Sequence, residues 1–201
     1  MKKFLLLSFL GLSCLHQASA QDVAVAAPPQ NTTNYKPVRL LLGGAFEFGG
    51  DEVAKVYFTN GQDQSVRAGQ GVSVAVGAEF QFPKAEQLLL RATIGYKYVT
   101  TQADNAHIRL TRVPLQFTAN WMATEKIRVG AGIVTHRAIK FNADEIGENF
   151  KLSAATGTVF EVAYSGFGLS YTIMKYKDQL NNTYSANAVG VTMSGVLPRR
   201  R

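Results

Sequence analysis

A strict alternation of bulky apolar residues with small or polar residues is the feature that most constrains this chain. Between residues 71 and 82, valine, alanine and phenylalanine occupy every second position, and mostly glycine, alanine, serine and single polar residues lie between them. A period of two places the bulky side chains on one face of a β-strand and the small ones on the other. Similar alternation recurs along the chain and predicts eight strands, near 38–50, 68–82, 87–100, 108–121, 127–141, 151–164, 168–177 and 184–197.

The connections between these predicted strands alternate in length. Three are short turns (83–86, 122–126 and 165–167), and four are longer and more polar (51–67, 101–107, 142–150 and 178–183). An even strand number, with short periplasmic turns and longer extracellular loops, is typical of bacterial outer-membrane barrels. The sequence therefore predicts an all-β protein, an eight-stranded antiparallel up-and-down transmembrane β-barrel.

A soluble barrel of the lipocalin type would show the same alternation, because it also buries one face of each strand. Its polar face would meet water and would be rich in lysine, glutamate, glutamine and threonine. Here that face is largely glycine, alanine, serine and threonine. Small side chains suit the interior of an eight-stranded barrel, whose lumen is just wide enough for side chains to fill. The composition therefore favours the membrane barrel.

The N-terminal residues 1–20 have the parts of a secretory signal peptide. Lys2 and Lys3 precede a short apolar run, and Ala18-Ser19-Ala20 offers a small-x-small cleavage site. Cys14 opens an alternative, a lipoprotein signal, although Gly11 stands where that signal normally has a branched apolar residue. We expect export to the bacterial outer membrane.

Four segments follow from these observations. We expect a signal peptide at 1–20, a periplasmic lead-in at 21–36, the barrel at 37–197 and a basic tail at 198–201. The formal net charge is +7, but apart from Lys2 and Lys3 of the signal peptide and the three arginines of the tail, the basic residues are scattered singly. Because no basic cluster is interleaved with aromatic residues, we expect no nucleic-acid partner.

Seven charged residues fall on the predicted inner face of the strands. They are Glu47, Glu79, Arg91, Lys97, Arg112, Arg128 and Glu161. Buried charges must be paired and hydrogen-bonded, so we interpret this set as a structural plug that fills the lumen. The alternative interpretation is a gate whose ion pairs exchange to let small ions pass.

Two hairpins predict specific contacts within this set. Pairing Phe82 with Leu88 across the turn at 83–86 makes the numbers of paired residues sum to 170, which predicts a cross-strand ion pair between Glu79 and Arg91. In the same way, pairing Trp121 with Ile127 across the turn at 122–126 places Asn120 beside Arg128.

Proline is the exception within the predicted strands. Pro114 lies inside the strand near 108–121. Proline cannot donate a ladder hydrogen bond, and a closed barrel offers no edge strand to hold it. We therefore predict a bulge or a break in the ladder at Pro114.

The sequence contains no convincing catalytic, cofactor or metal site. A lipid hydrolase of the outer leaflet would need a nucleophile within reach of a base such as His136, but no serine lies two residues away, and His136 falls on the inward face. The acidic residues Asp144, Glu145, Glu148 and Asp178 do not match the spacing of a calcium loop. We expect no enzyme activity, no cofactor and no metal.

Two short segments carry a family resemblance. The segments Arg112-Val113-Pro114-Leu115-Gln116-Phe117 and Arg128-Val129-Gly130-Ala131-Gly132 resemble the opacity/OmpX-like family of small outer-membrane barrels. The resemblance implies an eight-stranded barrel without a continuous pore, and no single activity. Chains of that family usually end in an aromatic residue, whereas this chain ends Leu197-Pro198 and three arginines.

These observations predict a non-enzymatic outer-membrane protein. It would strengthen the envelope, meet external partners through its extracellular loops, or do both. The alternatives are a narrow pathway for ions or solutes and a lipid hydrolase of the outer leaflet. The expected partners are outer-membrane lipids and lipopolysaccharide, the barrel-assembly machinery during insertion, and external proteins.

Overall fold

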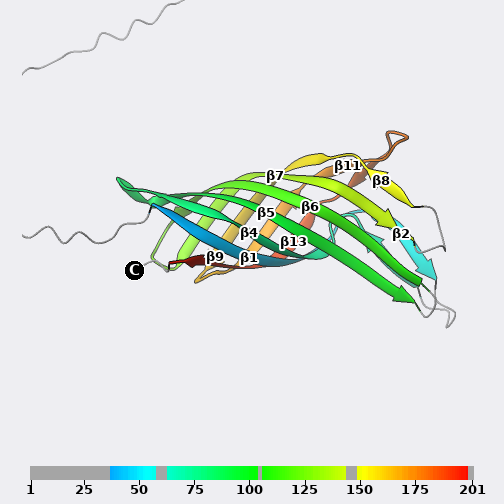
Figure 1. The fold of residues 1–201 in the computed structure, drawn as a ribbon, viewed down its shortest axis with the longest axis horizontal. Coiled ribbons are helices and arrows are strands. Elements are labelled where there is room, and N and C mark those ends of the chain that lie inside the picture. The colour runs from blue at the N-terminus through cyan, green and yellow to red at the C-terminus, as the bar shows by residue number, and fades with distance from the viewer. Residues whose placement is uncertain (1–36, 58–62, 104–105, 144–148, 199–201) are drawn as a thin grey trace, which may run out of the picture. The chain divides into compact units, whose positions relative to one another are not determined.

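The computed structural model describes residues 37–57, 63–103, 106–143 and 149–198 (Figure 1). The predicted signal peptide, the predicted lead-in and the last three residues of the predicted basic tail lie outside the described residues. The strands are β1 (Val38–Phe48), β2 (Glu52–Tyr57), β3 (Asp63–Arg67), β4 (Gly71–Phe82), β5 (Ala85–Ala103), β6 (Ala106–Met122), β7 (Ile127–Asn142), β8 (Phe150–Leu152), β9 (Ala155–Tyr164), β10 (Phe167–Ile173), β11 (Lys175–Lys177), β12 (Thr183–Ser185) and β13 (Ala188–Leu197).

Within these residues, the long strands form a closed antiparallel barrel. Its order is β1, β4, β5, β6, β7, β9, β10 and β13, and each strand pairs with the next along the chain. The pairing of β13 with β1 closes the sheet. The predicted eight-stranded up-and-down barrel is confirmed. Below, the end with the short turns is called the turn end, and the opposite end the loop end.

The loop end contains more strand than the sequence predicted. The expected loop at 51–67 is in fact a hairpin of β2 and β3. The expected loop at 101–107 was also wrong, because β5 continues to Ala103 and pairs with β6 up to Ala106. Backbone hydrogen bonds hold these extensions together, so they do not need the apolar alternation on which the prediction relied.

Three predicted strands are interrupted near the loop end. β8 and β9 are separated at 153–154, β10 and β11 at Met174, and β12 and β13 at 186–187. The Met174 N–H donates to the side-chain oxygen of Asn187 at 2.9 Å instead of to a ladder partner. A side chain therefore replaces the backbone ladder at this break.

The ladder is interrupted at Pro114, as predicted. Register between β5 and β6 runs to Ile94 opposite Leu115 and resumes at Lys97 opposite Arg112, leaving the pairs at Gly95 and Tyr96 unformed. A Cβ at Gly95 would lie 3.2 Å from the Pro114 ring. Glycine therefore gives the proline ring room at the break.

The outer face of the barrel is apolar over its whole circumference. The exposed side chains include residues of each barrel strand, among them Leu42, Val74, Ile94, Phe117, Ile133, Phe160, Leu169 and Val191. Soluble monomers rarely expose a contiguous apolar surface of this extent, and such surfaces mark contact with a membrane or another protein. An apolar band around a closed barrel, which leaves no free sheet edge, is the surface that lipid requires.

The described residues include no helix that is long and apolar enough to cross a membrane.

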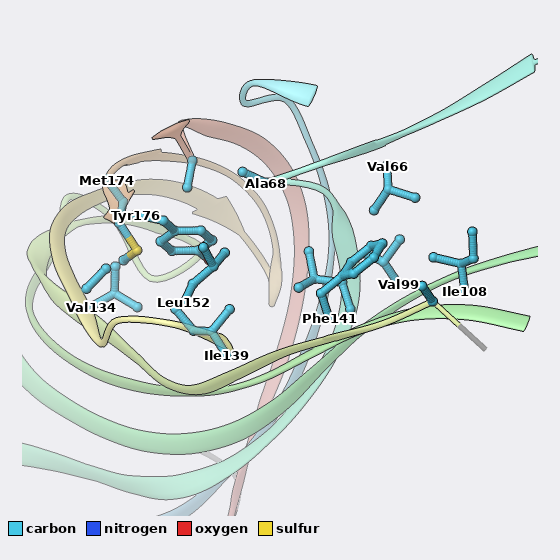
Figure 2. Close-up of a cluster of buried hydrophobic side chains, with 14 of the residues drawn as sticks. Val66, Ala68, Val99, Ile108, Val134, Ile139, Phe141, Leu152, Met174 and Tyr176 are labelled. Carbon is cyan, nitrogen blue, oxygen red and sulfur yellow. The ribbon is translucent and has the colours of Figure 1, made fainter. Parts of the chain in front are cut away.

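Beyond the apolar band, the loop end has a small apolar core of its own (Figure 2). Leu110 and Ile139, from β6 and β7, are almost completely buried there, with Val66 of β3. The rings of Phe141 and Phe150 stack with their centroids 4.6 Å apart. The core packs side chains of β3, β6, β7 and β8 together at the loop end.

Candidate functional site

The barrel lumen contains two groups of charged side chains. The turn-end cluster is made of Arg39, Glu79, Gln81, Arg91, Asn120, Arg128, Glu161, Thr192 and Ser194. The loop-end cluster is made of Glu47, Lys97, Arg112, His136 and Tyr176. All seven charged residues named from the sequence point inward: Glu79, Arg91, Lys97, Arg112 and Arg128 are buried, and Glu47 and Glu161 are half-buried.

Glu79 is at the centre of one half of the turn-end cluster and is fully buried. Its Oε2 accepts from Arg91 Nε at 2.8 Å and lies 2.7 Å from Arg91 Nη2. The predicted Glu79–Arg91 ion pair is therefore confirmed. Its Oε1 lies 3.0 Å from Arg39 Nη2, so one carboxylate joins two arginines.

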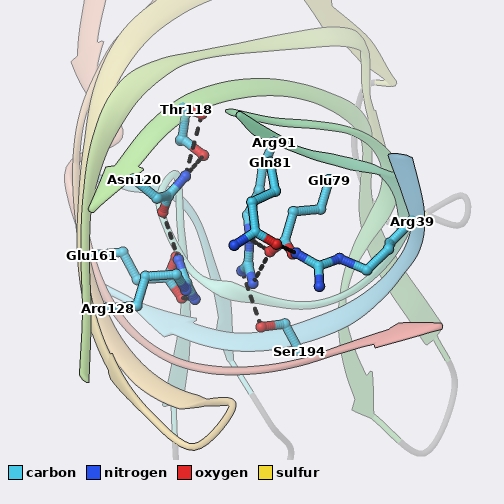
Figure 3. A network of polar contacts seen from close by, with 9 residues as sticks. All are labelled: Arg39, Glu79, Gln81, Arg91, Thr118, Asn120, Arg128, Glu161 and Ser194. Carbon is cyan, nitrogen blue, oxygen red and sulfur yellow. Dashed lines mark hydrogen bonds and ion pairs between the residues drawn. The ribbon is translucent and has the colours of Figure 1, made fainter. Parts of the chain in front are cut away.

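Arg39 is a buried charged residue that the sequence prediction missed. It alternates with Glu47 on the same face of β1, and that parity could have identified it. Arg39 also donates to Gln81 Oε1 at 2.6 Å, and Arg91 donates to Ser194 Oγ at 3.2 Å (Figure 3). These contacts link β1, β4, β5 and β13 across the lumen.

The turn preceding Arg91 differs from its prediction. Residues pair with numbers summing to 170 from Val72 to Gln81, but Phe82 lies opposite Ala85 rather than Leu88. An irregularity between Gln81 and Phe82 absorbs the difference. The predicted register was right for the ion pair and wrong for the residues beside the turn, where local turn geometry sets the pairing.

Arg128 is at the centre of the other half of the turn-end cluster. Its guanidinium binds Glu161 in a bidentate manner, with Nη1 to Oε2 at 2.8 Å and Nη2 to Oε1 at 3.0 Å. Nη1 also donates to Asn120 Oδ1 at 2.6 Å, and Thr192 Oγ1 donates to Glu161 Oε1 at 2.7 Å. Bidentate pairs of this kind are among the stronger side-chain contacts in proteins.

The hairpin that brings Asn120 to Arg128 has a different register from the predicted one. Trp121 pairs with Val129, not Ile127, so Gly130 lies opposite Asn120 and Arg128 is a diagonal neighbour. A Cβ at Gly130 would lie 2.1 Å from Asn120 Oδ1. The missing side chain at Gly130 therefore makes room for the Asn120 amide.

In the loop-end cluster, the cationic side chains donate most of their hydrogen bonds to backbone carbonyls. Lys97 Nζ lies 2.8 Å from Glu47 Oε2 and donates to the carbonyl of Gly69 at 2.7 Å. Arg112 donates to the carbonyls of Ala68 and Gln70. The segment 68–70, between β3 and β4, is thus bound by both cations.

Tyr176 completes this cluster. Its hydroxyl accepts from Arg112 Nη1 at 3.2 Å and lies 2.5 Å from His136 Nδ1. The sequence analysis did not single out Tyr176, although it continues the series of buried inner-face residues at every second position, Ser170, Thr172 and Met174. Its contacts depend on strands distant in the sequence, which parity alone does not place.

An internal cavity of about 120 Å³ separates the two clusters. Its polar lining includes Arg91 and Glu161 toward the turn end, His136 toward the loop end, and Gln116 and Thr172 between them. Such a polar cavity has room for ordered water.

The geometry bears directly on the catalytic alternative. His136 is buried in the lumen against Tyr176, so it does not face lipid as the base of a lipid hydrolase would. Within the described residues, no three histidine, cysteine, aspartate or glutamate side chains are grouped to hold a metal ion. Asp144, Glu145 and Glu148 lie outside the described residues.

The closed barrel, the apolar outer band and the charged lumen together decide the architecture. The protein is a small eight-stranded outer-membrane β-barrel. An apolar exterior around a polar, side-chain-filled interior is the arrangement of barrels that cross the outer membrane.

Comparison with known proteins finds distant likenesses among solved structures. No family model matches the sequence, and no curated protein matches it. Among solved structures, the chain is similar to Ail, the attachment invasion locus protein of Yersinia pestis, crystallised with the heparin analogue sucrose octasulfate. The identity is 10%, the TM-score is 0.40, and 79% of this chain and 97% of that chain are covered. It is also similar to Neisserial surface protein A, with 11% identity, a TM-score of 0.42, and the same shares, 79% and 97%. Because these likenesses are distant, the architecture rests on this chain's own strands and side chains.

Proposed function

We propose that this protein is a non-enzymatic, non-conducting outer-membrane barrel that presents its loop end to the cell exterior. The observation that carries the proposal is the pair of charge clusters that cross the lumen. A barrel whose interior is filled by linked side chains serves as an anchor and a scaffold rather than as a channel.

The turn-end cluster is the principal block. Side chains from β1, β4 and β5 meet at Glu79, while side chains from β7, β9 and β13 meet at Glu161. Arg91 reaches Ser194 of β13, the strand from which Thr192 contacts Glu161, so the two groups meet on β13. Opening a conduit would require several buried ion pairs to separate, and each separation leaves an uncompensated charge.

The loop end supplies ordered surface for external partners. The hairpin of β2 and β3 has an exposed ion pair, Lys55 Nζ to Asp63 Oδ2 at 2.6 Å. The turn between β11 and β12 is organised by Asp178, whose carboxylate accepts backbone N–H groups from Leu180 and Asn182, both at 2.8 Å. Structured hairpins lose little conformational entropy on binding, which favours recognition. We also propose that the barrel-assembly machinery inserts the protein into the outer membrane with its loop end outside.

Planar-bilayer recording of the purified, refolded protein tests the block. We expect no steady single-channel steps from the natural sequence. A known porin reconstituted in the same way is the positive control. A variant that removes half of the turn-end cluster, Arg39→Ala with Glu79→Ala and Arg91→Ala, should also stay silent, because the loop-end cluster still crosses the lumen. Steady steps from the natural sequence would overturn the proposal.

The polar cavity between the clusters favours a narrow pathway as the second candidate. Water in a cavity lined by Arg91, Glu161 and His136 could support passage if both clusters opened. The same recording decides between the two candidates. Under the conducting candidate, Glu161→Gln should change the ion selectivity of the natural steps, because Glu161 lines the cavity.

A further inference from the structure

The outer face of the loop end carries six exposed cations on neighbouring strands. We call them the basic belt: Arg109 on β6, Arg137 and Lys140 on β7, Lys151 on β8, and Lys175 and Lys177 on β11. None of them belongs to the lumen clusters. Their side chains are exposed on the outer surface of the barrel, to which the proposed function assigns no role.

Sheet register makes the belt contiguous. Lys140 pairs with Lys151, and on its other side with Thr111, two residues from Arg109. The Ser153 N–H donates to the Lys177 carbonyl at 2.9 Å, which places β11 beside the end of β8. Four adjacent segments, β6, β7, β8 and β11, therefore present cations on one side of the loop end.

The belt lies directly above the apolar band. On β10, Ile173 is 45% exposed, and the next outward residue along the chain is Lys175. Two residues of β-strand span roughly 6.6 Å. On β7 the outward series passes from Ile133 through Thr135 to Arg137. The cations thus begin where the apolar surface ends, at the depth of lipid headgroups.

Charge within the belt is uncompensated by the part of the protein that the structure describes. Lys140 and Lys151 are cross-strand partners, and like charges in directly opposite positions destabilise a sheet. The described residues provide none of the six belt cations with a carboxylate within ion-pair distance, whereas Lys55 of the β2–β3 hairpin is paired with Asp63. A bound anion between the two lysines would remove the repulsion.

We propose that the basic belt binds the phosphate groups of a phosphorylated glycolipid in the surrounding outer leaflet. Depth selects this ligand over a soluble partner, because a lipid already in the leaflet sets its acyl chains against Ile133 and Ile173 while its phosphates meet the cations above them. Near a membrane surface, each lysine or arginine contributes to binding anionic lipid. The inference requires membrane insertion with the loop end outward, and it does not require the lumen to be blocked.

Lipid enrichment around the reconstituted full-length protein tests this inference. The protein is inserted into phosphatidylcholine vesicles that contain either diphosphoryl lipid A or dephosphorylated lipid A, and the lipid retained after gentle detergent extraction is quantified. We expect several-fold enrichment of the diphosphoryl form over the dephosphorylated form. Equal retention of both forms by the natural sequence would overturn the inference without any variant.

Matched double variants locate the binding site. Lys140→Gln with Lys151→Gln should lose most of the enrichment, whereas Lys84→Gln with Lys126→Gln, which removes the same charge from exposed positions at the turn end, should keep it. Heat-dependent electrophoretic mobility verifies that each barrel is folded. Equal enrichment in both variants would contradict the assignment to the belt, as would full competition by soluble pyrophosphate or by an acidic peptide at equal phosphate or carboxylate concentration.

The two proposals fail in different ways. Conductance of the same samples reports on the lumen alone, while enrichment reports on the outer face alone. Steady channel steps with intact lipid enrichment would overturn only the proposal that the lumen is blocked. A barrel that shows no channel steps and no lipid enrichment would overturn only the proposal that the basic belt binds lipid.

Discussion

The two lumen clusters are built by different means. In the turn-end cluster, carboxylates on strands hold arginines on strands: Glu79 joins Arg39 and Arg91, and Glu161 joins Arg128. In the loop-end cluster, the cations of Lys97 and Arg112 are bound largely by backbone carbonyls of the segment 68–70.

This difference affects how each cluster responds to change. Where a charge is balanced by a single buried carboxylate, one substitution leaves its partners uncompensated. Where a cation has several carbonyl acceptors, losing one neutral contact costs the energy of a hydrogen bond. The turn-end cluster should therefore be the more sensitive of the two.

The largest effect is expected for Glu79→Gln. The substitution leaves the buried guanidinium groups of Arg39 and Arg91 without their shared carboxylate, at a cost of about 3–5 kcal/mol in the free energy of unfolding. Urea unfolding in lipid vesicles, followed by Trp121 fluorescence, measures this cost.

Arg91→Met should cost less, because Glu79 keeps its contact with Arg39. Because Glu79 still pairs with Arg39 in that variant, adding Glu79→Gln to Arg91→Met should lower the free energy of unfolding further and recover none of the loss. An equal cost for Glu79→Gln and Gln116→Leu, a cavity-lining control without a charge, would contradict the comparison of the clusters.

A smaller loss is expected for Gly130→Ala. The new methyl group would collide with the Asn120 side chain, so that Asn120 must move away from Arg128. Overpacking of this kind costs about 1–3 kcal/mol. Thermal unfolding of the single variants and of Gly130→Ala with Asn120→Ala measures the coupling. If the double variant loses the sum of the two single losses, the steric explanation is wrong.

In the loop-end cluster, Tyr176→Phe should have a moderate effect. It removes one hydroxyl from between Arg112 and His136, while the carbonyls of Ala68 and Gln70 remain. The expected loss is about 1–2 kcal/mol. Urea unfolding under the conditions used for Glu79→Gln makes the comparison direct, and a loss as large as that of Glu79→Gln would show that the two clusters respond alike.

The smallest effect concerns the exposed turn at Asp178. Desolvation pushes the pKa of this carboxyl upward, but hydrogen bonds from Asn182, Leu180 and Tyr184 outweigh it and lower the pKa below its usual value. The stabilisation of the turn is therefore complete above the usual aspartate pKa and is lost as the pH falls through the lowered value.

Amide hydrogen exchange at Leu180 and Asn182 measures this dependence. Protection should decrease on acidification in the natural sequence and should not change with pH, beyond the intrinsic exchange rate, in Asp178→Asn. Identical pH profiles for the two proteins would contradict the role given to Asp178.

The sequence by itself determined the barrel, its closure into eight strands and the faces of its side chains. A period of two is a local property of strands. The narrow lumen accepts mainly small side chains, so the inner face is rich in glycine, alanine, serine and threonine, and this composition can be recognised in the sequence. It also predicted the contact of Glu79 with Arg91, because the two residues share the inner face and the expected register holds from Val72 to Gln81, although the pairing beside the turn differs. The break in the ladder at Pro114 was also predictable, because the missing N–H donor is a property of the proline residue itself.

Only the tertiary structure decided the contacts between strands that are far apart in the chain. Arg39 meets Glu79 because β1 pairs with β4, and the β2–β3 hairpin lies between these two strands in the sequence. Tyr176 meets His136 beyond the interruption between β10 and β11, and the alternation of the sequence does not reveal that interruption. The basic belt likewise depends on the pairing of Lys140 with Lys151 over a connection whose length does not set the register. Alternation specifies which way each side chain points, whereas the relative shift of distant strands depends on closing the whole barrel.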